Sequence, residues 1–291
     1  KMSEEYIDIM MLIQNRGSYI EDYFNYIMKD VEHAYPNIHF RYFILENDST
    51  DNTLEALQNM KKNHDITIIS DTFPELMNIR RTIRLGILRN YLQYRVKKLI
   101  SQKNVPFGKY TLVIDSDIVF SVKTIQYILE IKKKRTDFAM LGINCENIGR
   151  EYPSYYDSLA LNYASEYSRY SSREVTNILK KREIPLLNVH TCFGGIIIVE
   201  SLAYYNAIWG YKVSEMYTLY CKSVMCEHYH FCKYIQNWGK IGICLHTHGG
   251  WTSDWNNNKY KVYKYCEKHN LFPSNSKNIS LYIELKGHLE I

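Results

Sequence analysis

Short apolar runs alternate with helical patterns along the first half of the chain. The apolar runs lie at 7–13, 40–45, 66–70 and 110–114. They are continuous rather than alternating in polarity, which is typical of parallel strands buried on both faces of a sheet. The spacing of apolar residues between them predicts helices at 18–30, 53–62, 78–100 and 122–135. Four such β-α units predict an α/β fold whose mostly parallel sheet binds ligands beyond the carboxyl ends of its strands.

The first predicted helix carries a start signal. It follows a turn at residues 15–17, and Ser18 and Glu21 then have the spacing of a capping box. In that motif each side chain bonds the backbone N–H of the other residue, which satisfies two donors that the helix leaves free. We therefore expect the helix to begin at Ser18.

The pattern becomes less regular in the second half of the chain. Further strands and helices are expected at 138–143, 173–182, 194–199, 227–236 and 241–245. No repeat, Pro/Gly linker or abrupt change of composition divides the sequence. We therefore expect a single domain over 1–291, with a nucleotide-binding half over about 1–120 and a half over about 121–291 that completes the site.

Composition excludes several classes of protein. Hydrophobic residues make up 46% of the 291 residues and charged residues 23%, which excludes a disordered or collagen-like chain. No apolar run is long enough for a transmembrane segment, and the first residues lack the layout of a signal peptide. The seven cysteines are an odd number without a C-x-x-C pair, which indicates reduced thiols. We expect a cytoplasmic protein, or a soluble part of a larger one.

The positive charge of the chain is modest. The chain has 36 Lys and Arg residues against 31 Asp and Glu residues. The basic clusters at 132–135 and 180–182 fall where helices are expected to end. Cations at a helix C-terminus interact favourably with the helix dipole. We therefore interpret both clusters as solvated helix ends and expect no nucleic-acid partner.

Two carboxylates follow the fourth predicted strand. Asp115 and Asp117 flank Ser116 directly after 110–114, so both side chains lie at the carboxyl edge of the sheet. Carboxylates this close repel each other unless a cation lies beside them. The D-x-D pattern also arises by chance or as a helix cap, but its position after a strand favours a metal site.

A polar loop follows the second predicted strand. Capping of the next helix accounts for Ser49, Asp51 and Thr53. It does not account for Glu46 and Asn47, which come directly off the strand end. Their side chains can accept a hydrogen bond from a nucleobase or a ribose hydroxyl.

The helix at 78–100 carries several arginines. Arg80, Arg81, Arg84 and Arg89 precede the acidic loop, and Arg81 and Arg84 share one helix face. Guanidinium groups match the geometry of phosphate oxygens, so this helix is a candidate for binding a diphosphate. Surface salt bridges are the alternative.

Several blocks of sequence resemble one family. ILENDSTDNT and VIDSD resemble the first-loop and D-x-D motifs of glycosyltransferases of the GT-A fold. RTIRLGILRNYL, YYDSLAL, CFGGIII and CEHYHFCKYIQNWGKIGI look like the fungal capsule-type α-1,3-mannosyltransferase family and its bacterial and viral relatives. The blocks occur in the same order and cover about 40–250. The resemblance implies a single-domain GT-A fold, which is Rossmann-like with helices flanking the sheet.

The resemblance also implies a reaction. A nucleotide-diphosphate sugar, linked to GDP or UDP, would donate its sugar to a hydroxyl of a glycan or glycoprotein acceptor, with GDP-mannose and retention of configuration favoured. Asp117 would bind Mn²⁺ or Mg²⁺ directly, Asp115 would bind the ribose or the metal through water, and Arg89 would assist the phosphates. A metal at the two phosphates stabilises the departing diphosphate without proton transfer.

A third metal ligand is expected after the strand at 241–245. One of His246 and His248 is expected to reach the ion. We expect His248, because a Gly-Gly pair follows it and the His-Gly sequence looks like the C-terminal metal histidine of several GT-A enzymes. His246 is the alternate.

Glu227 and Asp157 are the candidate catalytic carboxylates. Glu227 lies at a predicted helix N-terminus, which favours an ionised carboxylate, and Asp157 lies in an aromatic segment. Either residue can instead cap a helix. Gly194 and Gly195 are expected to form a backbone floor for the sugar-containing ligands, and Trp251 a platform for a sugar ring.

Three other functions remain open at this point. The Cys and His residues between 221 and 248 can form a structural zinc site, although their spacing does not match the usual pairings. A nucleotidyltransferase or phosphohydrolase has a related fold, but the first loop here has one glycine where a phosphate-binding loop has several. A non-catalytic sugar-binding module is the third alternative.

Overall fold

A computed structural model gives the architecture of the chain. It describes residues 5–148, 154–155, 160–161, 176–177, 179, 184–210, 226–251, 264 and 268. Asp157 and the basic cluster at 180–182 lie outside these residues, as does most of the helix expected at 173–182. Within the described residues, no helix is both long enough and apolar enough to cross a bilayer.

The first half of the chain forms the parallel strands that its apolar runs predict. They are β1 (Glu5–Ile13), β2 (Ile38–Asn47), β3 (Ile66–Asp71) and β4 (Tyr110–Ile114). Their order in the sheet is β3-β2-β1-β4, and each neighbouring pair is parallel. Their carboxyl ends therefore meet at one edge, where a ligand site is expected.

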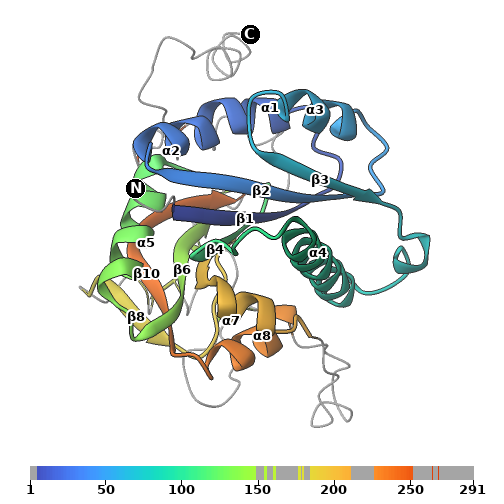
Figure 1. Cartoon of the computed structure of the whole chain (residues 1–291). Coiled ribbons are helices and arrows are strands. Elements are labelled where there is room, and N and C mark those ends of the chain that lie inside the picture. Colours follow the sequence, from blue (N-terminus) through green and yellow to red (C-terminus); the bar gives the residue numbers. More distant parts are fainter. Residues whose placement is uncertain are drawn as a thin grey trace, which may run out of the picture.

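Helices cover both faces of this sheet (Figure 1). They are α1 (Ile20–Tyr23), a π-helical turn (Phe24–Met28), α2 (Lys29–Ala34), α3 (Thr53–Met60), α4 (Arg81–Lys103) and α5 (Val122–Lys134). One apolar cluster joins the strands to α1, α3 and α5, and a second joins them to α4 and the later helices. Each face of the sheet thus has its own core, as the continuous apolar strands require.

The first helix does not begin with the predicted capping box. It begins at Ile20, its N-cap is Tyr19, and no side chain caps it. The backbone N–H groups of Tyr19 and Ile20 donate to the carbonyl of Arg16, so a backbone turn starts the helix. Because other loops fix the backbone at Arg16, the start lies two residues beyond Ser18.

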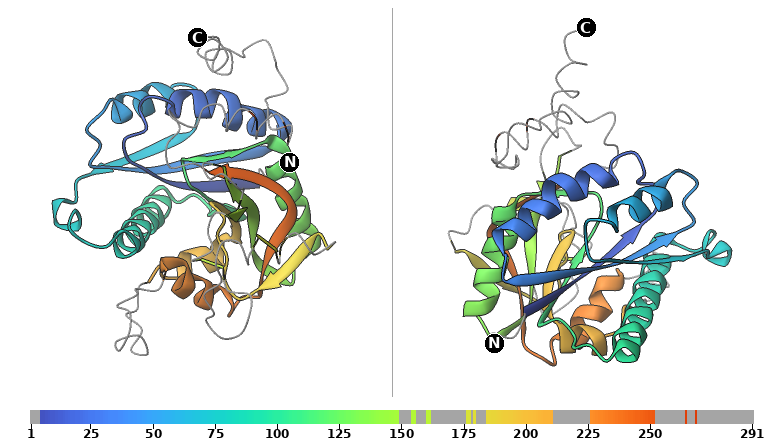
Figure 2. Two further views of the ribbon diagram at one scale, coloured as in Figure 1. Left: turned by 180° about the vertical axis from the view of Figure 1, so that it is seen from behind. Right: turned by 45° about the horizontal axis from the view of Figure 1, so that its top comes forward.

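The second half of the chain completes the sheet with strands of both directions. These are β5 (Ile118–Phe120), β6 (Phe138–Asn147), β7 (Ser154–Tyr155), β8 (Leu186–Val189), β9 (Ile196–Glu200) and β10 (Lys240–Trp251). β9 lies between β4 and β6 and is antiparallel to both, whereas β10 is parallel to β6 and antiparallel to β5. Figure 2 shows how strongly the sheet curls. The expected α/β fold is confirmed, but the parallel series ends at β4 because a tight turn rather than a helix links β4 to β5.

Two short helices from the second half lie beside α4. They are α7 (Ser201–Asn206) and α8 (Glu227–Ile235), and both pack into the core cluster that contains α4. This arrangement brings the first turn of α8 toward the carboxyl edge of the sheet.

One basic residue expected in solvent is instead buried. Lys132 lies in the last turn of α5, and its Nζ donates to the Glu200 carboxylate at 2.7 Å and lies 5.1 Å from the centre of the Tyr110 ring. Burial of an ammonium group requires such a partner. The cluster at 132–135 is therefore partly a structural ion pair, with Lys133 and Lys134 at the surface.

Candidate active site

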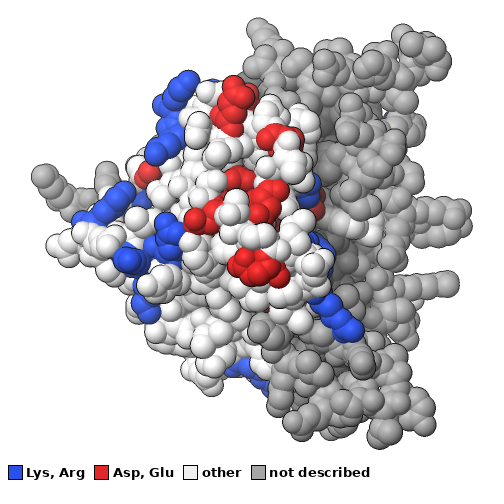
Figure 3. All heavy atoms as spheres, turned by 90° about the vertical axis from the view of Figure 1, so that its right-hand side faces the viewer, with Lys and Arg blue, Asp and Glu red and all other residues white. Residues whose placement is uncertain are grey.

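A cavity of about 330 Å³ lies at the carboxyl edge of the parallel strands. Its walls are the ends of β1 and β2, the first half of α4, the turn after β4, Phe193 and the first residues of α8. Figure 3 views the molecule from the side toward which β1, β2 and β3 run, and Asp and Glu side chains gather near the middle of this face with Lys and Arg beside them. The volume lies in the usual range for small-molecule sites.

The acidic residues Asp115 and Asp117 lie in the turn between β4 and β5, and both line the cavity. The backbone N–H of Asp115 donates to the Gly195 carbonyl at 2.9 Å, and the N–H of Ile118 donates to the Asp115 carbonyl at 3.3 Å. These bonds fix the turn against the strand that follows Gly195. The two carboxylates are therefore held at one position on the cavity wall.

Gly194 and Gly195 support this turn rather than lining the cavity. Both have positive φ angles, of 69° and 79°. A Cβ atom at Gly195 would lie 2.4 Å from the Ile118 side chain, and one at Gly194 would lie 2.3 Å from the Ile143 carbonyl. Glycine is required here for its conformation and for close packing. Among the four residues 192–195, it is Phe193 that faces the cavity.

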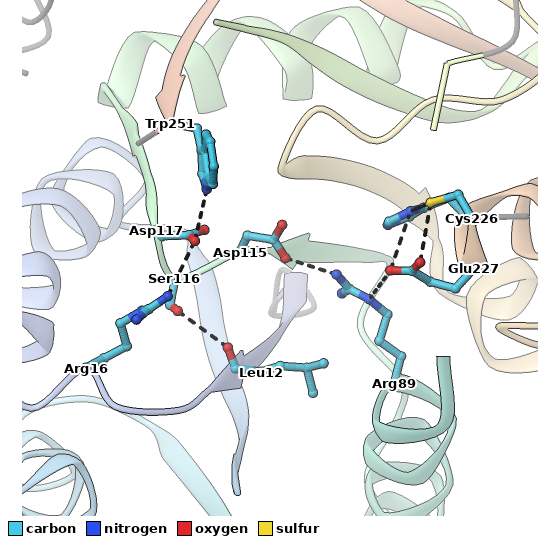
Figure 4. A network of polar contacts seen from close by, with 10 residues as sticks. Leu12, Arg16, Arg89, Asp115, Ser116, Asp117, Cys226, Glu227 and Trp251 are labelled. Atoms are coloured by element: carbon cyan, nitrogen blue, oxygen red, sulfur yellow. Dashed lines mark hydrogen bonds and ion pairs between the residues drawn. The ribbon is translucent and has the colours of Figure 1, made fainter. Parts of the chain in front are cut away.

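Arg89 joins the acidic turn to α8 (Figure 4). Its guanidinium donates to Asp115 Oδ1 at 3.0 Å, and its Nε lies 4.0 Å from Glu227 Oε1. The Phe193 and Trp209 rings lie on it, each with its centre 4.9 Å away. Burial disfavours the charged form, but the Asp115 and Glu227 carboxylates outweigh it and raise the pKa of Arg89 above its usual value. Arg89 is thus a permanently charged link between two parts of the site.

Asp117 has a different set of partners. Its Oδ2 accepts a hydrogen bond from Trp251 Nε1 at 3.0 Å and lies 3.5 Å from the guanidinium of Arg16. Burial raises the pKa of Asp117 above its usual value, and the charge of Asp115 raises it further while Arg16 lowers it. Sequence reasoning missed Arg16, because 101 residues separate it from Asp117.

Glu227 is the first residue of α8 and is almost completely buried. The Cys226 thiol donates to Glu227 Oε2 at 3.3 Å, and Cys226 Sγ lies 2.9 Å from His228 Nδ1. Burial raises the pKa of Glu227 above its usual value, against the lowering effect of Arg89. Burial also holds the pKa of His228 well below its usual value, and the positive charge of Arg89 adds to this. The His228 imidazole is therefore neutral beside a carboxyl group that lines the cavity.

The residues expected to bind the nucleotide divide into two groups. Asn47, Arg81 and Arg84 line the cavity. Glu46 is buried beside it, where its carboxylate accepts hydrogen bonds from the Ser49 backbone at 3.1 Å and from the Ser70 hydroxyl at 2.6 Å. Glu46 therefore fixes the loop after β2 to β3.

Polar residues that follow β2 also hold the loop after β1. The Arg16 N–H donates to Thr53 Oγ1 at 2.7 Å, and the Gly17 N–H donates to the Asp51 carboxylate at 3.0 Å. Asp51 also accepts from the Thr53 N–H at the start of α3, whereas the N-cap residue, Asn52, makes no side-chain capping bond. Burial alone would raise the pKa of Asp51, but hydrogen bonds from Thr53 and Gly17 lower it below its usual value. These polar residues thus position Arg16 and also bond the first residue of α3.

His248 lies apart from the acidic turn. β10 does not end near 245 as expected but continues to Trp251, which pairs with Ile118 beside Asp117. His248 is three residues earlier, outside the cavity lining, and its carbonyl accepts a hydrogen bond from the Thr124 hydroxyl at 2.9 Å. His246 is exposed. Trp251, not a histidine, is the β10 side chain that contacts Asp117.

The cysteine-rich region forms one compact group of possible metal ligands in the part of the chain that the structure describes. The group is Cys226, Glu227 and His228, whose ligand atoms lie within 4.8 Å of one another. The thiol and imidazole of this group already bond each other. The five described cysteines are free thiols in buried positions.

The acidic turn has the donor set of a divalent-cation site. Asp115 and Asp117 present carboxylate oxygens to one cavity, and the charge of Asp115 raises the pKa of Asp117. Oxygen ligands of this type suit Mg²⁺ and Mn²⁺, so the residues fit such an ion.

Comparison with known proteins gives likeness in structure alone. No protein-family model matches the chain, and no curated protein matches it. A solved structure of S. aureus TarS residues 1–349 is similar with a TM-score of 0.50 and 13% identity, over 91% of this chain and 64% of that one. The full TarS structure is similar with a TM-score of 0.50 and 12% identity, over 90% of this chain and 39% of that one. TarS residues 1–349 have also been solved in complex with UDP-GlcNAc, with a TM-score of 0.49.

These comparisons bear on the fold. At 12–13% identity the likeness shows that the chain has the α/β fold found in GT-A glycosyltransferases. The chain spans less than two thirds of the TarS chains that it matches.

Proposed function

We propose that this protein is a metal-dependent glycosyltransferase that moves a sugar from a nucleotide-diphosphate donor to a hydroxyl of a glycan or glycoprotein acceptor. The observation that carries the proposal is the cavity at the carboxyl edge of the sheet. One wall has the carboxylates of Asp115 and Asp117, and the facing helix α4 has Arg81 and Arg84. Paired carboxylates for a divalent cation and guanidinium groups for phosphates are what a diphosphate leaving group requires.

The side chains have separate tasks in this proposal. Asp117 and Asp115 would hold Mn²⁺ or Mg²⁺, which when bound stabilises the negative charge of the departing diphosphate. Arg81 and Arg84 bind phosphate oxygens from α4, and Asn47 accepts a hydrogen bond from the nucleoside. Arg89 orients the Asp115 carboxylate through its 3.0 Å hydrogen bond. Gly194 and Gly195 contribute by fixing the turn that carries both aspartates.

Glu227 is the catalytic carboxylate that we propose within the described residues. It lines the cavity next to Arg89, and burial raises its pKa. A carboxylate with a raised pKa is a better proton acceptor at neutral pH. In direct displacement it takes the proton of the acceptor hydroxyl, and under retention it stabilises positive charge that develops on the sugar. Asp157, which lies outside the described residues, stays a prediction.

The donor and the stereochemistry are the finer part of the proposal. The resemblance to capsule-type mannosyltransferases favours GDP-mannose and retention, whereas the fold neighbour TarS has been solved with UDP-GlcNAc. We propose a retaining transfer from a GDP- or UDP-linked sugar. NMR of the first product distinguishes retention from inversion, because the two anomers differ in the one-bond coupling constant between C1 and H1.

A thermal-shift experiment with GDP and UDP, each with and without Mn²⁺, tests the proposal. A ligand at 100 times its Kd stabilises the native state by about 2.7 kcal/mol, which for a chain of this size is a shift on the order of 5 °C. We expect that shift only when nucleotide and Mn²⁺ are both present. Asp117→Asn should abolish it. Asp65→Asn is the control, because this carboxylate pairs with His39 at the surface, away from the cavity lining.

Two results would overturn the proposal. One is wild-type protein that shows no shift with either nucleotide in Mn²⁺. The other is Asp117→Asn protein that retains the full Mn²⁺-dependent shift.

A further inference from the structure

Two arginines contact the acidic turn, and the structure holds them differently. Arg89 is buried, donates to Asp115 at 3.0 Å and lies 4.9 Å from the centre of each of two aromatic rings. The Arg16 side chain is 32% exposed, and its guanidinium lies 3.5 Å from Asp117 Oδ2, at the long end of a hydrogen bond. Arg89 is therefore a fixed partner of Asp115, whereas the Arg16 guanidinium can move away from Asp117 at a small cost in free energy.

The backbone beneath Arg16 is fixed although its side chain is not. Hydrogen bonds from the Arg16 and Gly17 N–H groups to Thr53 and Asp51 hold the loop after β1. The N–H of Asn15 also donates to the Ser49 hydroxyl at 3.0 Å. Any movement of the Arg16 guanidinium is therefore a rotation of the side chain about an anchored Cα.

The guanidinium of Arg16 also has unused hydrogen-bonding capacity. Its Nε is buried and has no hydrogen-bond partner in the described part of the chain, whereas NH1 donates to the neighbouring Asn15 carbonyl at 3.2 Å and the guanidinium also bonds the Tyr19 side chain. The Tyr19 ring lies 5.8 Å away. A buried N–H without an acceptor has a cost in free energy. An anion with several oxygens in the cavity that Arg16 lines would supply the missing acceptor and remove this cost.

A cation at Asp117 would change the balance of charge. Arg16 and the Trp251 indole both donate to the same oxygen, Asp117 Oδ2. A divalent cation bound to that oxygen would lie beside the guanidinium and repel it. Trp251 carries no charge, so the repulsion acts on Arg16 alone.

We propose that Arg16 is a transferable counter-ion: it neutralises Asp117 before a divalent cation binds, and it moves to the diphosphate of the donor once the cation takes Asp117. The planar guanidinium can then bond phosphate oxygens through Nε and an NH2 group together. Arg16 is thus a positioning residue that couples metal binding to donor binding. The identity of the anion rests on the proposed function, whereas competition between Arg16 and the cation does not.

The test measures Mn²⁺ binding directly, by electron paramagnetic resonance of free Mn²⁺, in the full chain without nucleotide. Arg16→Gln removes the competing charge and should bind Mn²⁺ about fivefold more tightly than wild type, as expected for loss of one exposed like charge. Arg16→Lys keeps the charge and should bind Mn²⁺ as wild type does. Arg95→Gln is the control, since this arginine pairs with Asp71 at 2.9 Å and lies outside the cavity lining. It should leave Mn²⁺ affinity unchanged.

The second measurement is calorimetric binding of GDP and UDP in saturating Mn²⁺. Arg16→Gln should weaken nucleotide binding by about tenfold, as loss of a charge-assisted contact does, and Arg16→Lys should recover part of the loss. Opposite effects on the two ligands are the signature of a transferable charge. A merely structural role for Arg16 would weaken both.

The results separate the two proposals. Unchanged or weaker Mn²⁺ binding by folded Arg16→Gln, in a wild type that binds Mn²⁺ and nucleotide, overturns the role of Arg16 and leaves the proposed function standing. Tighter Mn²⁺ binding with unchanged nucleotide affinity also overturns it, since the charge is then not transferred. Wild-type protein that binds neither ligand overturns both.

Discussion

Glu227 shows how one residue's surroundings set its chemistry. Its carboxylate is buried at the first turn of α8, where the helix dipole and Arg89 favour the ionised form while burial disfavours it. Burial dominates, so the pKa of Glu227 is raised. We expect Glu227→Gln to keep the size of the side chain and its place beside Arg89, but to lower kcat for sugar transfer by roughly 10²- to 10⁴-fold.

Steady-state kinetics with the donor identified by thermal shift would measure this loss. Nucleotide binding in Mn²⁺ should stay close to that of wild type, because Glu227 is assigned to the sugar rather than to the phosphates. Glu146→Gln is a useful control, since this glutamate lies on β6 outside the cavity lining. Full activity of Glu227→Gln would show that Glu227 has no catalytic role and only begins α8.

At the scale of elements, the loops after β1 and β2 form one unit. Thr53 is completely buried at the start of α3, and its hydroxyl accepts the Arg16 N–H and bonds the Asp51 carboxylate. Thr53→Val removes both bonds with little change in side-chain volume. It leaves the Arg16 N–H without its hydrogen-bond acceptor. We expect a loss of about 1–3 kcal/mol in the free energy of unfolding, measured by urea titration. Nucleotide affinity should fall too, because Arg16 loses its anchor.

Thr50→Val provides the comparison in the same loop. Its hydroxyl is exposed and lies 3.4 Å from Asn15 Oδ1, so water can replace the bond. The free energy of unfolding should change by less than about 0.5 kcal/mol, as at other surface positions. Equal losses in the two variants would show that the Thr53 hydroxyl is not a special link between the loops.

At the scale of the whole molecule, local pattern predicted the β-α units, but not the contacts between distant segments. The first four strands and their helices follow from apolar spacing alone, since each unit is contiguous in sequence. The direction of β9 depends on which strands it joins. Trp251 reaches Asp117 across 134 residues, and nothing near Trp251 in the sequence indicates this.

The site was predictable to a similar extent. Asp115, Asp117, Arg81, Arg84 and Arg89 were selected because strand ends and helix faces can be read locally, and the structure brings them to one cavity. Glu46 and Gly195 were selected for the same edge but support its loops, because whether a side chain faces ligand or loop is decided by packing. His248 was expected to bind the metal because a Gly-Gly pair follows it, and this role stays a prediction. The structure shows that Trp251 contacts Asp117, because β10 continues beyond 245 to this residue.

The stability of the whole fold should depend on pH through His228. Burial holds the pKa of His228 well below its usual value, whereas in the unfolded chain its pKa is about 6.5. Between these two values the unfolded state binds a proton that the folded state does not. The free energy of unfolding is therefore highest above about pH 6.5 and falls as the pH is lowered, by at most about 1.4 kcal/mol per pH unit for this one group.

His228→Gln removes this contribution. The imidazole also stacks on Phe193 at 4.1 Å between ring centres, so the variant should be less stable than wild type at pH 8. Its stability should nevertheless fall less steeply from pH 7 to pH 5, and urea titrations at each pH would show two curves that converge. His39→Gln, in which the replaced side chain is half exposed, controls for the loss of a histidine as such. Parallel curves for wild type and His228→Gln would mean that the folded protein accommodates a charged imidazole at this position, contrary to its burial beside Arg89.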